Sequence, residues 1–356
     1  MNNSLGKKDS GIYRTGDVIL VNSALGSPGA GWTSINSSAQ VTDKSNLAKT
    51  LKQSFYNWSP QVSAISTTIN SVAYGNGVWV VGGGVSSSAL QTSTNDGVTW
   101  NTQTSNFGSG INSIQYGNGI FVAGCGSAGG QGILATSSNG TSWTTRASNF
   151  QSSINAVAFG NGVWVGGGFG YSTQAANIRT STNGLVWHTQ TSNFSTNQTV
   201  NSIAYGNGLW IASAPVGGIR TSTNDGVTWT TSTAIIGNSF AYGNGVWVAA
   251  GGGVLRTSTN DAVTWTTQGT SFSVDSIVFA DGVFTVTAGT SVYTAADGVN
   301  WVEYSNAFTT VMKSIRYGNG IWVAGGGTGS INRYIKNILP IVASTTIGGY
   351  TWWIKT

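Results

Sequence analysis

Acidic side chains that could act in catalysis are scarce in this chain. Ten of its 356 residues are Asp or Glu. Five recur in turn motifs, Asp96, Asp225, Asp261, Asp281 and Asp297, and three precede the repeats, Asp9, Asp17 and Asp43. Glycoside hydrolysis generally requires two carboxyl groups across one bond. The two remaining acids, Asp275 and Glu303, fall on predicted inner and outer strands respectively, so we expect no catalytic pair and no enzymatic activity.

Other reactive side chains are equally isolated. His188 and Cys125 are each the only residue of their type, which argues against a disulfide within the chain, a Cys-based metal site and a Ser-His or Cys-His nucleophile. We therefore predict no metal and no cofactor. Among the basic residues, Arg316 precedes Tyr317 on a predicted inner strand and is the best candidate for a charge facing a central channel. Arg179, Arg220 and Arg256 share one position on a predicted outer strand and are expected to lie toward the rim.

The elements that would position these side chains come from a repeat. A Tyr/Phe-Gly-Asn-Gly unit occurs seven times, with Phe-Ala-Asp-Gly as its sixth form, at spacings of 37 to 46 residues. The copies begin at Tyr74, Tyr116, Phe159, Tyr205, Tyr242, Phe279 and Tyr317. This period is in the range of a four-stranded propeller blade.

Each repeat predicts the same four strands. In the first repeat these are residues 69–74, 78–81, 90–93 and 98–102, called strands A to D. Asn76-Gly77 between the first two is typical of a type I′ hairpin turn. Seven such units without long helices predict an all-β, seven-bladed β-propeller of four-stranded antiparallel blades, with a short N-terminal leader outside it.

The turn between strands C and D carries a recognisable motif. Ser93-Thr94-Asn95-Asp96-Gly97-Val98-Thr99-Trp100 resembles the Asp-box, or BNR repeat, and it returns at 222–229 and 258–265, with looser forms ending at Trp143, Trp187 and Trp301. The family usually has Asp where this chain has Asn95, Asn224 and Asn260. The resemblance implies a structural turn, remote from any ligand, formed by Asp96, Trp100, Trp143, Trp187, Asp225, Trp229, Asp261, Trp265, Asp297 and Trp301.

Asp-box propellers include sialidases, lectins, sortilin-like receptors and phage virion proteins, so the family does not fix the function. Sialidases grip the substrate carboxylate with three Arg from inner strands and use a Tyr nucleophile with acidic partners. This chain has neither the Arg-rich N-terminal motif of that family nor a second inner-strand acid beside Asp275.

Ring closure has two candidates. Trp58 precedes Tyr74 by the same interval that separates Trp100 from Tyr116, so we expect residues 57–62 to supply strand D of the last blade. The alternative is the degenerate motif at 345–352, which ends in Trp352. The favoured division is a leader or particle-attachment segment (1–56), a propeller (57–337) and a C-terminal tail (338–356). Within the leader we expect a strand at 18–21 and an amphipathic helix at 44–55.

Candidate ligand-binding residues lie in the longest B–C and D–A connections, which fall in blades 2, 3 and 4. The B–C segments are 124–132 and 167–177, and the D–A segment is 195–199. Loops on a rigid scaffold commonly carry function. The aromatic and amide side chains there suit neutral sugars or a protein: Gln131, Phe169, Tyr171, Gln174, Asn177, Asn197 and Gln198.

Composition narrows the class of function. The net charge of +5 reflects few acids rather than a dense basic stripe, so no nucleic-acid partner is expected. We find no secretory signal peptide and no apolar run long enough for membrane insertion. Because 7% of residues are charged and Gly, Ser, Thr and Asn abound, the chain resembles phage tail, fibre and capsid-decoration proteins.

This second resemblance implies a non-catalytic virion structural protein, made in the host cytoplasm and forming a homo-oligomer. Its leader would bind other virion proteins, and its propeller would bind a host-surface receptor or glycan. The alternative is a cellular lectin or protein-binding scaffold propeller, and a sialidase-like hydrolase ranks third.

Overall fold

Two compact units make up the chain, residues 57–335 and residues 1–56 with 336–356. The computed structural model describes residues 58–335 except 85–88, 106, 171–177, 216, 233–236, 252 and 270–271. It also describes the strands at 18–22, 32–34, 346–347 and 350–355. Each unit is described by itself.

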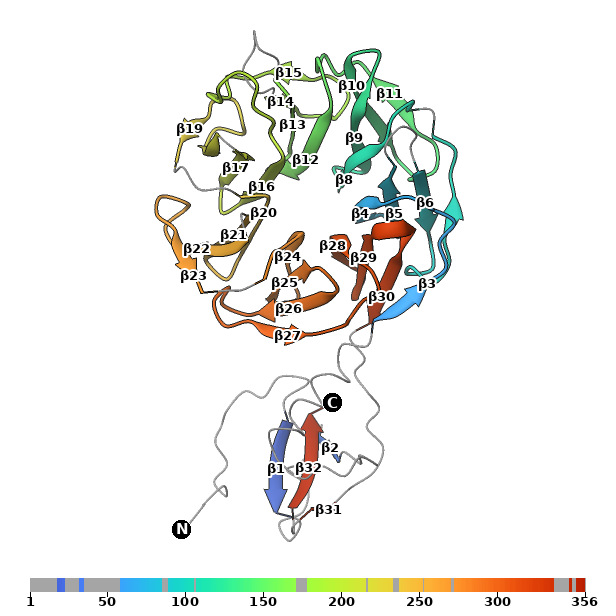
Figure 1. Cartoon of the computed structure of the whole chain (residues 1–356), viewed down its shortest axis with the longest axis vertical. Helices are drawn as coiled ribbons and strands as arrows, with labels where there is room; N and C mark the ends of the chain where they lie inside the picture. The colour runs from blue at the N-terminus through green and yellow to red at the C-terminus, as the bar shows by residue number, and fades with distance from the viewer. Residues whose placement is uncertain are drawn as a thin grey trace. The chain divides into compact units, whose positions relative to one another are not determined.

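The larger unit is a seven-bladed β-propeller, which confirms the predicted fold (Figure 1). Strand A of each blade lies innermost, and strand B pairs with it in antiparallel register. The A strands are β4 (Ile69–Gly75), β8 (Ile111–Gly117), β12 (Ile154–Gly160), β16 (Ser202–Gly206), β20 (Ser239–Gly243), β24 (Ser276–Ala280) and β28 (Met312–Gly318). The B strands are β5 (Val78–Gly83), β9 (Ile120–Ala128), β13 (Val163–Gly168), β17 (Leu209–Ala214), β21 (Val246–Gly251), β25 (Val283–Ala288) and β29 (Ile321–Gly326).

Strands C and D complete each blade. The C strands are β6 (Ala89–Ser93), β10 (Gln131–Ser137), β14 (Ile178–Ser181), β18 (Gly218–Ser222), β22 (Val254–Ser258), β26 (Ser291–Ala295) and β30 (Ile331–Ile335). The outer D strands are β7 (Asn101–Thr102), β11 (Thr144–Arg146), β15 (His188–Thr189), β19 (Thr230–Thr231), β23 (Thr266–Gln268), β27 (Val302–Tyr304) and, in blade 7, β3 (Ser59–Gln61). A short 3₁₀ turn, Gly327–Gly329, precedes β30.

The A–B turns follow the predicted chemistry. Asn76 and Gly77 have φ of 49° and 76°, and Tyr74 pairs with Trp79 across the turn. A type I′ turn needs positive φ at both central residues, which Asn and Gly tolerate. The six other A–B turns show the same pair of positive φ angles.

Ring closure comes from the N-terminal side of the propeller. β3 pairs antiparallel with β30, with Ser59 opposite Arg333, so the strand after Trp58 completes blade 7. Trp352 instead lies in β32 (Tyr350–Lys355), which pairs with β1 (Val18–Asn22) and β2 (Trp32–Ser34) and, through a hairpin, with β31 (Thr346–Ile347). The leader and the tail, treated separately in the sequence analysis, thus share one sheet. The expected helix at 44–55 lies outside the described residues.

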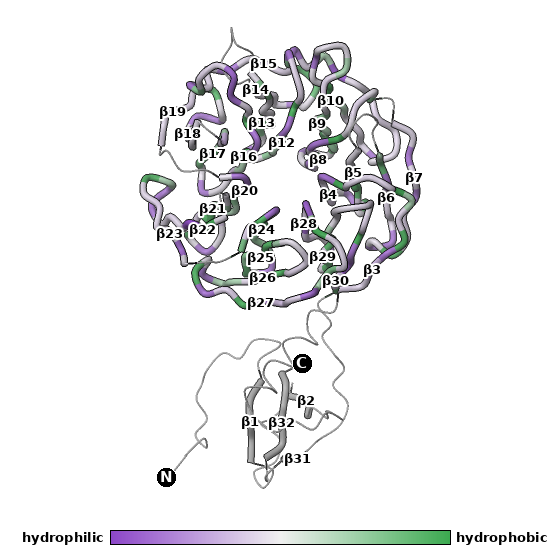
Figure 2. Tube along the Cα trace, in the orientation of Figure 1, coloured by the Kyte–Doolittle hydropathy of each residue, from purple (hydrophilic) through white to green (hydrophobic). Residues whose placement is uncertain are grey.

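The core lies between neighbouring blades. Figure 2 shows hydrophobic residues along the middle strands of the blades. The strand-A aromatic ring of each blade packs on the strand-B ring of its own blade, as Tyr74 does on Trp79 with centroids 4.7 Å apart. In six blades it also covers the last glycine of the preceding blade's strand A, whereas strand A of blade 6 ends in Ala280. A Cβ at Gly75 would overlap the Tyr116 ring, so glycine is needed for this approach.

The C–D turns are held by side-chain hydrogen bonds. In blade 1, Ser93 Oγ accepts from Gly97 N at 2.9 Å, Asn95 Oδ1 accepts from Thr99 N at 3.0 Å, and Trp100 Nε1 donates to Gly97 O at 3.0 Å. Strand D begins only after this Trp, at Asn101, and not at Val98 as expected. The reason is that residues 95–100 are committed to the turn and cannot also pair with strand C.

The Asp of these turns links neighbouring blades. Asp96 Oδ1 accepts from Asn319 Nδ2 of blade 7 at 2.9 Å. Asp225 and Asp261 accept in the same way from Asn161 and Asn207 of the preceding blades, at 2.9 and 2.8 Å. The Asn that shapes one A–B turn therefore also fastens the next blade's C–D turn.

Candidate binding site at the channel mouth

The A strands line a central channel with one repeated sequence pattern. Near its start, strand A carries Asn-Ser in blades 1, 2, 4 and 5. The corresponding pair is Asn-Ala in blade 3, Asp-Ser in blade 6 and Lys-Ser in blade 7. In blades 1, 2, 3 and 7 the first of these residues sits at a shift in register between strands A and B, as Asn70 does between Ile69 and Ser71. A bulge re-aims the side chain of its extra residue. The result is a polar rim around a cavity of about 180 Å³.

The serines of this pattern join adjacent blades. Ser71 Oγ accepts from Ile114 N of blade 2 at 2.8 Å, and Ser314 Oγ accepts from Val72 N of blade 1 at 3.1 Å. The equivalent bonds run from blade 3 to Ser113, from blade 6 to Ser239 and from blade 7 to Ser276. These bonds fasten the inner strands at five blade boundaries, from blade 5 through blades 6, 7, 1 and 2 to blade 3, so the channel mouth is preorganised there.

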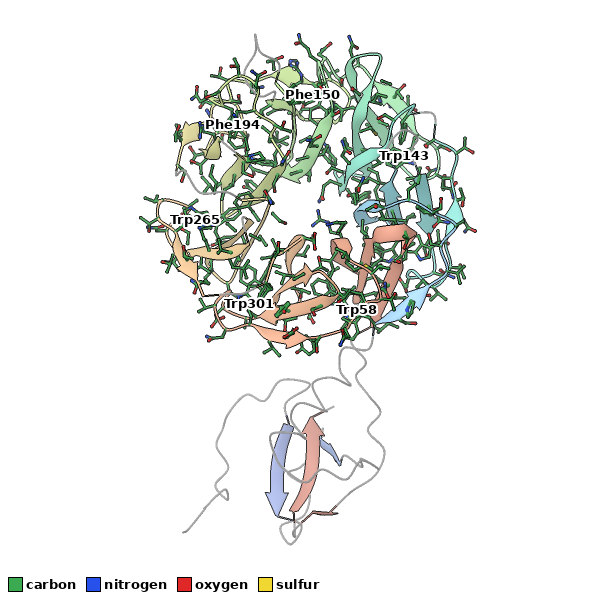
Figure 3. The ribbon with its side chains drawn as sticks, in the orientation of Figure 1. Trp58, Trp143, Phe150, Phe194, Trp265 and Trp301 are labelled. Carbon is green, nitrogen blue, oxygen red and sulfur yellow. The ribbon has the colours of Figure 1, made fainter. Side chains whose placement is uncertain are left out.

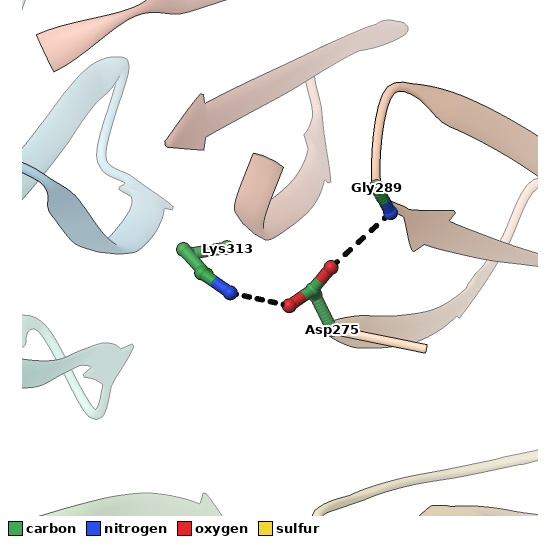
Figure 4. Close-up of polar contacts among 3 residues, drawn as sticks. All are labelled: Asp275, Gly289 and Lys313. Carbon is green, nitrogen blue, oxygen red and sulfur yellow. Dashed lines mark hydrogen bonds and ion pairs between the residues drawn. The ribbon is translucent and has the colours of Figure 1, made fainter. Parts of the chain in front are cut away.

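The rim carries one ion pair, between blades 6 and 7 (Figure 4). Lys313 Nζ lies 2.6 Å from Asp275 Oδ1, and Gly289 N donates to Asp275 Oδ2 at 3.3 Å. The side chains are 45% and 21% exposed for Lys313 and Asp275 respectively, so water screens the pair and its contribution to stability is modest. Asp275 faces the channel, as its sequence position indicated.

Arg316 also lies in the channel, as expected. It lines the rim cavity and a second cavity of about 220 Å³ further along the channel. Its Nη2 donates to Gln115 Oε1 at 3.0 Å, across the intervening blade 1. Burial lowers the pKa of the Arg316 guanidinium from its ordinary value, yet an Arg side chain stays protonated in proteins.

The predicted loop residues divide into two groups. Gln131 is not in a long loop: β9 and β10 continue to a two-residue turn at Gly129-Gly130, both with positive φ, and Gln131 pairs with Ala128. The expected loop at 124–132 is therefore wrong, because both strands extend to the turn. Gln131 is exposed at the tip of this hairpin.

The second group lies where blades 3 and 4 meet. Phe169 forms an isolated bridge with Thr199, and Gly170 N donates to Gln198 O at 2.9 Å. Phe169 and Gln198 are half-buried, and Asn197 is exposed with φ of 60°. The structure thus brings Phe169, Asn197 and Gln198 together. Tyr171, Gln174 and Asn177 lie outside the described residues.

These loops and the channel mouth are on one face. In an antiparallel meander, the B–C and D–A connections lie at the end where strand A begins, and the A–B and C–D turns lie at the other end. The candidate site therefore combines the polar rim with the described B–C and D–A residues of blades 2 to 4, which are Gln131 at its hairpin tip and Phe169, Asn197 and Gln198. The C–D turns are remote from it.

Two of the strand-C arginines, Arg179 and Arg220, pack against aromatic rings. The Arg179 guanidinium lies 5.0 Å from the Phe150 ring centroid, and that of Arg220 lies 4.8 Å from the Phe194 centroid. Arg220 also donates to the carbonyl oxygens of Asn193 and Gly217, at 3.1 and 2.7 Å. Burial lowers the pKa of both arginines. They stack between strands and do not converge on the channel.

Two recurring features were missed in the sequence analysis. Asn-Ser or an equivalent pair opens strand A in all seven repeats, which is a signal for the polar rim. Ser-Asn-Phe recurs at 105–107, 148–150 and 192–194, and its Phe packs against the outer part of a blade, as Phe107 does on Trp143 with centroids 5.7 Å apart. Figure 3 labels Phe150, Phe194 and three of the turn tryptophans, Trp143, Trp265 and Trp301, which lie around the ring toward the outer strands.

Groups for hydrolytic or metal chemistry are sparse at the site. Asp275 is the one acid among the described residues that line the two channel cavities. Glu303 lies on the outer strand β27, where its Oε1 accepts from Ser291 Oγ at 3.3 Å. Over the described ranges, no three His, Cys, Asp or Glu side chains gather as metal ligands. In the same ranges, no helix has the length and apolar character needed to cross a membrane.

Comparison with known proteins finds the fold but no family. No protein-family model and no curated protein sequence matches this chain. Solved structures do: YCF48 bound to a D1 peptide is similar with a TM-score of 0.61 and 14% identity, covering 79% of this chain and 97% of that chain. YCF48 from Cyanidioschyzon merolae (TM-score 0.58, 13% identity, 78% and 98% covered) and Saccharomyces cerevisiae Sqt1 (0.55, 11%, 77% and 97%) are also similar. At these identities the likeness shows the propeller fold, and the Asp-box resemblance stays a prediction.

Proposed function

We propose that this chain is a non-catalytic scaffold propeller that binds a peptide or protein segment on the face formed by the polar rim and the blade 2–4 loops. The observation that carries this is the rim of amide, hydroxyl and paired charged groups on the same face as the half-buried Phe169, whose N donates to Ser153 O just before strand A of blade 3. Fixed polar groups next to an aromatic anchor suit a segment that offers backbone hydrogen bonds and an apolar side chain. YCF48, a protein of similar fold, has been seen with a bound peptide, which supports this class of ligand.

The non-catalytic part of the proposal follows from the acids. Asp275 is held by Lys313 and Gly289, and a glycosidase of the general type would need a second carboxyl group within about 5–10 Å. Glu303, on an outer strand, cannot supply it. We expect no hydrolysis in a screen of fluorogenic glycosides.

A displayed library of random peptides tests the proposal, with the full chain as bait and a glycan array run in parallel. Peptides should be enriched, and fluorescence anisotropy should then show saturable binding that Phe169→Ala weakens by about tenfold or more, since an aromatic anchor is commonly a hot spot. Val263→Ala, at an exposed site on a C–D turn of the opposite face, is the matched control and should leave binding unchanged.

Three outcomes would contradict the proposal. The first is that no peptide is enriched, the second is that Val263→Ala loses binding as Phe169→Ala does, and the third is that glycans bind saturably where peptides do not. The last result would favour the lectin alternative. Circular dichroism on both variants separates lost binding from lost folding.

Attachment to a phage particle is a second, separate proposal that rests on composition alone. It predicts that the chain copurifies with particles and that removal of residues 1–56 abolishes this. Recovery of the protein only from particle-free fractions would reject it.

A further inference from the structure

Arg316 carries the one uncompensated charge among the described residues lining the channel. At its position on strand A the other blades have Ala73, Gln115, Ala158, Ala204, Ala241 and Val278. The second cation in the cavity, Lys313, is neutralised by Asp275 at 2.6 Å. The described cavity-lining residues therefore leave a net positive charge at Arg316.

The guanidinium has unused donors. It offers five N–H groups in a planar fork, and among the described residues its hydrogen-bond acceptor is Gln115 Oε1, a neutral oxygen. Small apolar side chains at this level provide no further acceptor. A half-buried cation is costly unless it is paired or hydrogen-bonded.

We propose that the channel is a binding site for a small oxyanion, a carboxylate or phosphate group, held by the Arg316 guanidinium. The fork geometry of Arg matches two oxygens of such a group. The cavities of about 180 and 220 Å³ that Arg316 lines leave room for it. The rim cavity is shared with the proposed peptide-binding face, but anion binding at Arg316 does not rest on that proposal.

Neighbouring groups set how tightly the anion binds. Asp275 lines the same rim cavity, so its negative charge weakens the binding of an anion there. Its ion pair with Lys313 also keeps the ammonium group from contacting that anion. Asp275→Asn should therefore strengthen binding severalfold, by removing a like charge and releasing the ammonium group. Arg316→Ala should weaken it by about tenfold or more, since a charge-assisted hydrogen bond is lost.

The experiment titrates the full chain with inorganic phosphate and, separately, with acetate by calorimetry at low, constant ionic strength. Arg316→Ala is expected to fold because Ala fills this position in four other blades, and circular dichroism checks this. The charge-matched control is Arg146→Gln, which removes a cation from the outer strand β11. In the wild type, Arg146 Nε donates to Thr136 Oγ1 at 2.8 Å. Acetate separates recognition of planar oxyanions from that of tetrahedral ones.

Saturable binding of either anion by the wild type and Arg146→Gln, lost in Arg316→Ala and strengthened in Asp275→Asn, supports the site. Equal binding by Arg316→Ala and the wild type overturns it. So does the absence of binding by the wild type to both anions at millimolar concentration. Binding that Asp275→Asn strengthens but Arg316→Ala leaves unchanged assigns the anion to Lys313 and also overturns the proposal.

Discussion

In each C–D turn, the residue three positions before the tryptophan adopts a left-handed conformation. Gly97, Gly140, Gly184, Gly226 and Gly298 fill this position with φ of 72° to 78°. In blade 5 it is Ala262, with φ of 63° and its methyl group buried. A Cβ at such an angle approaches the backbone, which is why glycine is favoured there.

Gly226→Ala is expected to lower the free energy of unfolding by about 1–2 kcal/mol, the usual cost of a left-handed non-glycine residue. The new Cβ would also lie 3.1 Å from Thr180 Cγ2 and from Val165 Cγ2, tighter than ordinary contact. Denaturant unfolding of the two proteins measures the difference.

The matched control is Ala262→Gly, which relieves similar strain but loses a buried methyl group worth about 0.8 kcal/mol. Its net effect should be under about 1 kcal/mol. A destabilisation by Ala262→Gly as large as that by Gly226→Ala would show that backbone conformation does not govern these turns.

At the scale of elements, the stability of the ring depends on the strand that closes blade 7. β3 is three residues long and pairs with β30. Trp58, immediately before it, is buried against Phe308 and Tyr334, with ring centroids 5.0 and 5.6 Å away. Burial of this ring adds apolar stabilisation to the few hydrogen bonds of a short strand.

Trp58→Ala should therefore destabilise the propeller by about 3–5 kcal/mol, the usual cost of truncating a buried aromatic residue. Trp352→Ala, in a strand of the other unit, should leave the propeller's unfolding transition unchanged. Calorimetric scans of both variants test this, and equal shifts of the propeller transition would argue against closure by β3.

At the scale of the whole molecule, bonds between blades make the ring cooperative. Ser71 to blade 2, Ser314 to blade 1 and Asp96 to blade 7 are all contacts that cross a blade boundary. Because β3 closes the ring, blades 1 and 7 share such contacts too. We expect one blade to open only when its neighbours also loosen.

Cys125, buried on β9 in blade 2, reports on that opening. Burial raises the pKa of its thiol to about 12, so the reactive thiolate is scarce in the folded protein. Labelling by a disulfide reagent at pH 8 should be slower than in denaturant by about a thousandfold or more. Trp58→Ala should accelerate it, whereas labelling at the unfolded rate would show that blade 2 opens freely.

Much of the fold could be predicted because each repeat is specified by residues that are close together in the sequence. Asn76-Gly77 specifies a tight hairpin wherever it occurs, and its seven copies set the blade count. The strand pairing within 124–132 could not be predicted, because Gly-rich sequence is compatible with extended strands as well as loops. The pattern there did not reveal that β9 and β10 continue to Gly129-Gly130.

The candidate site was only partly accessible from sequence. Arg316 and Asp275 were expected in the channel from their places on inner strands. The hydrogen bond from Arg316 to Gln115 and the ion pair of Asp275 with Lys313 were not expected. Each joins residues of different blades, and the sequence does not specify how far a side chain reaches across the ring.

By itself, the sequence determined the four-strand order of each repeat, the A–B turns and the number of blades, because these depend on residues within about forty positions of one another. Tertiary structure decided which segment closes the ring, that the leader and the tail share a sheet, and which polar groups meet at the channel mouth. Those outcomes depend on contacts between distant segments, where chain closure and burial rather than local conformational preference set the lowest free energy.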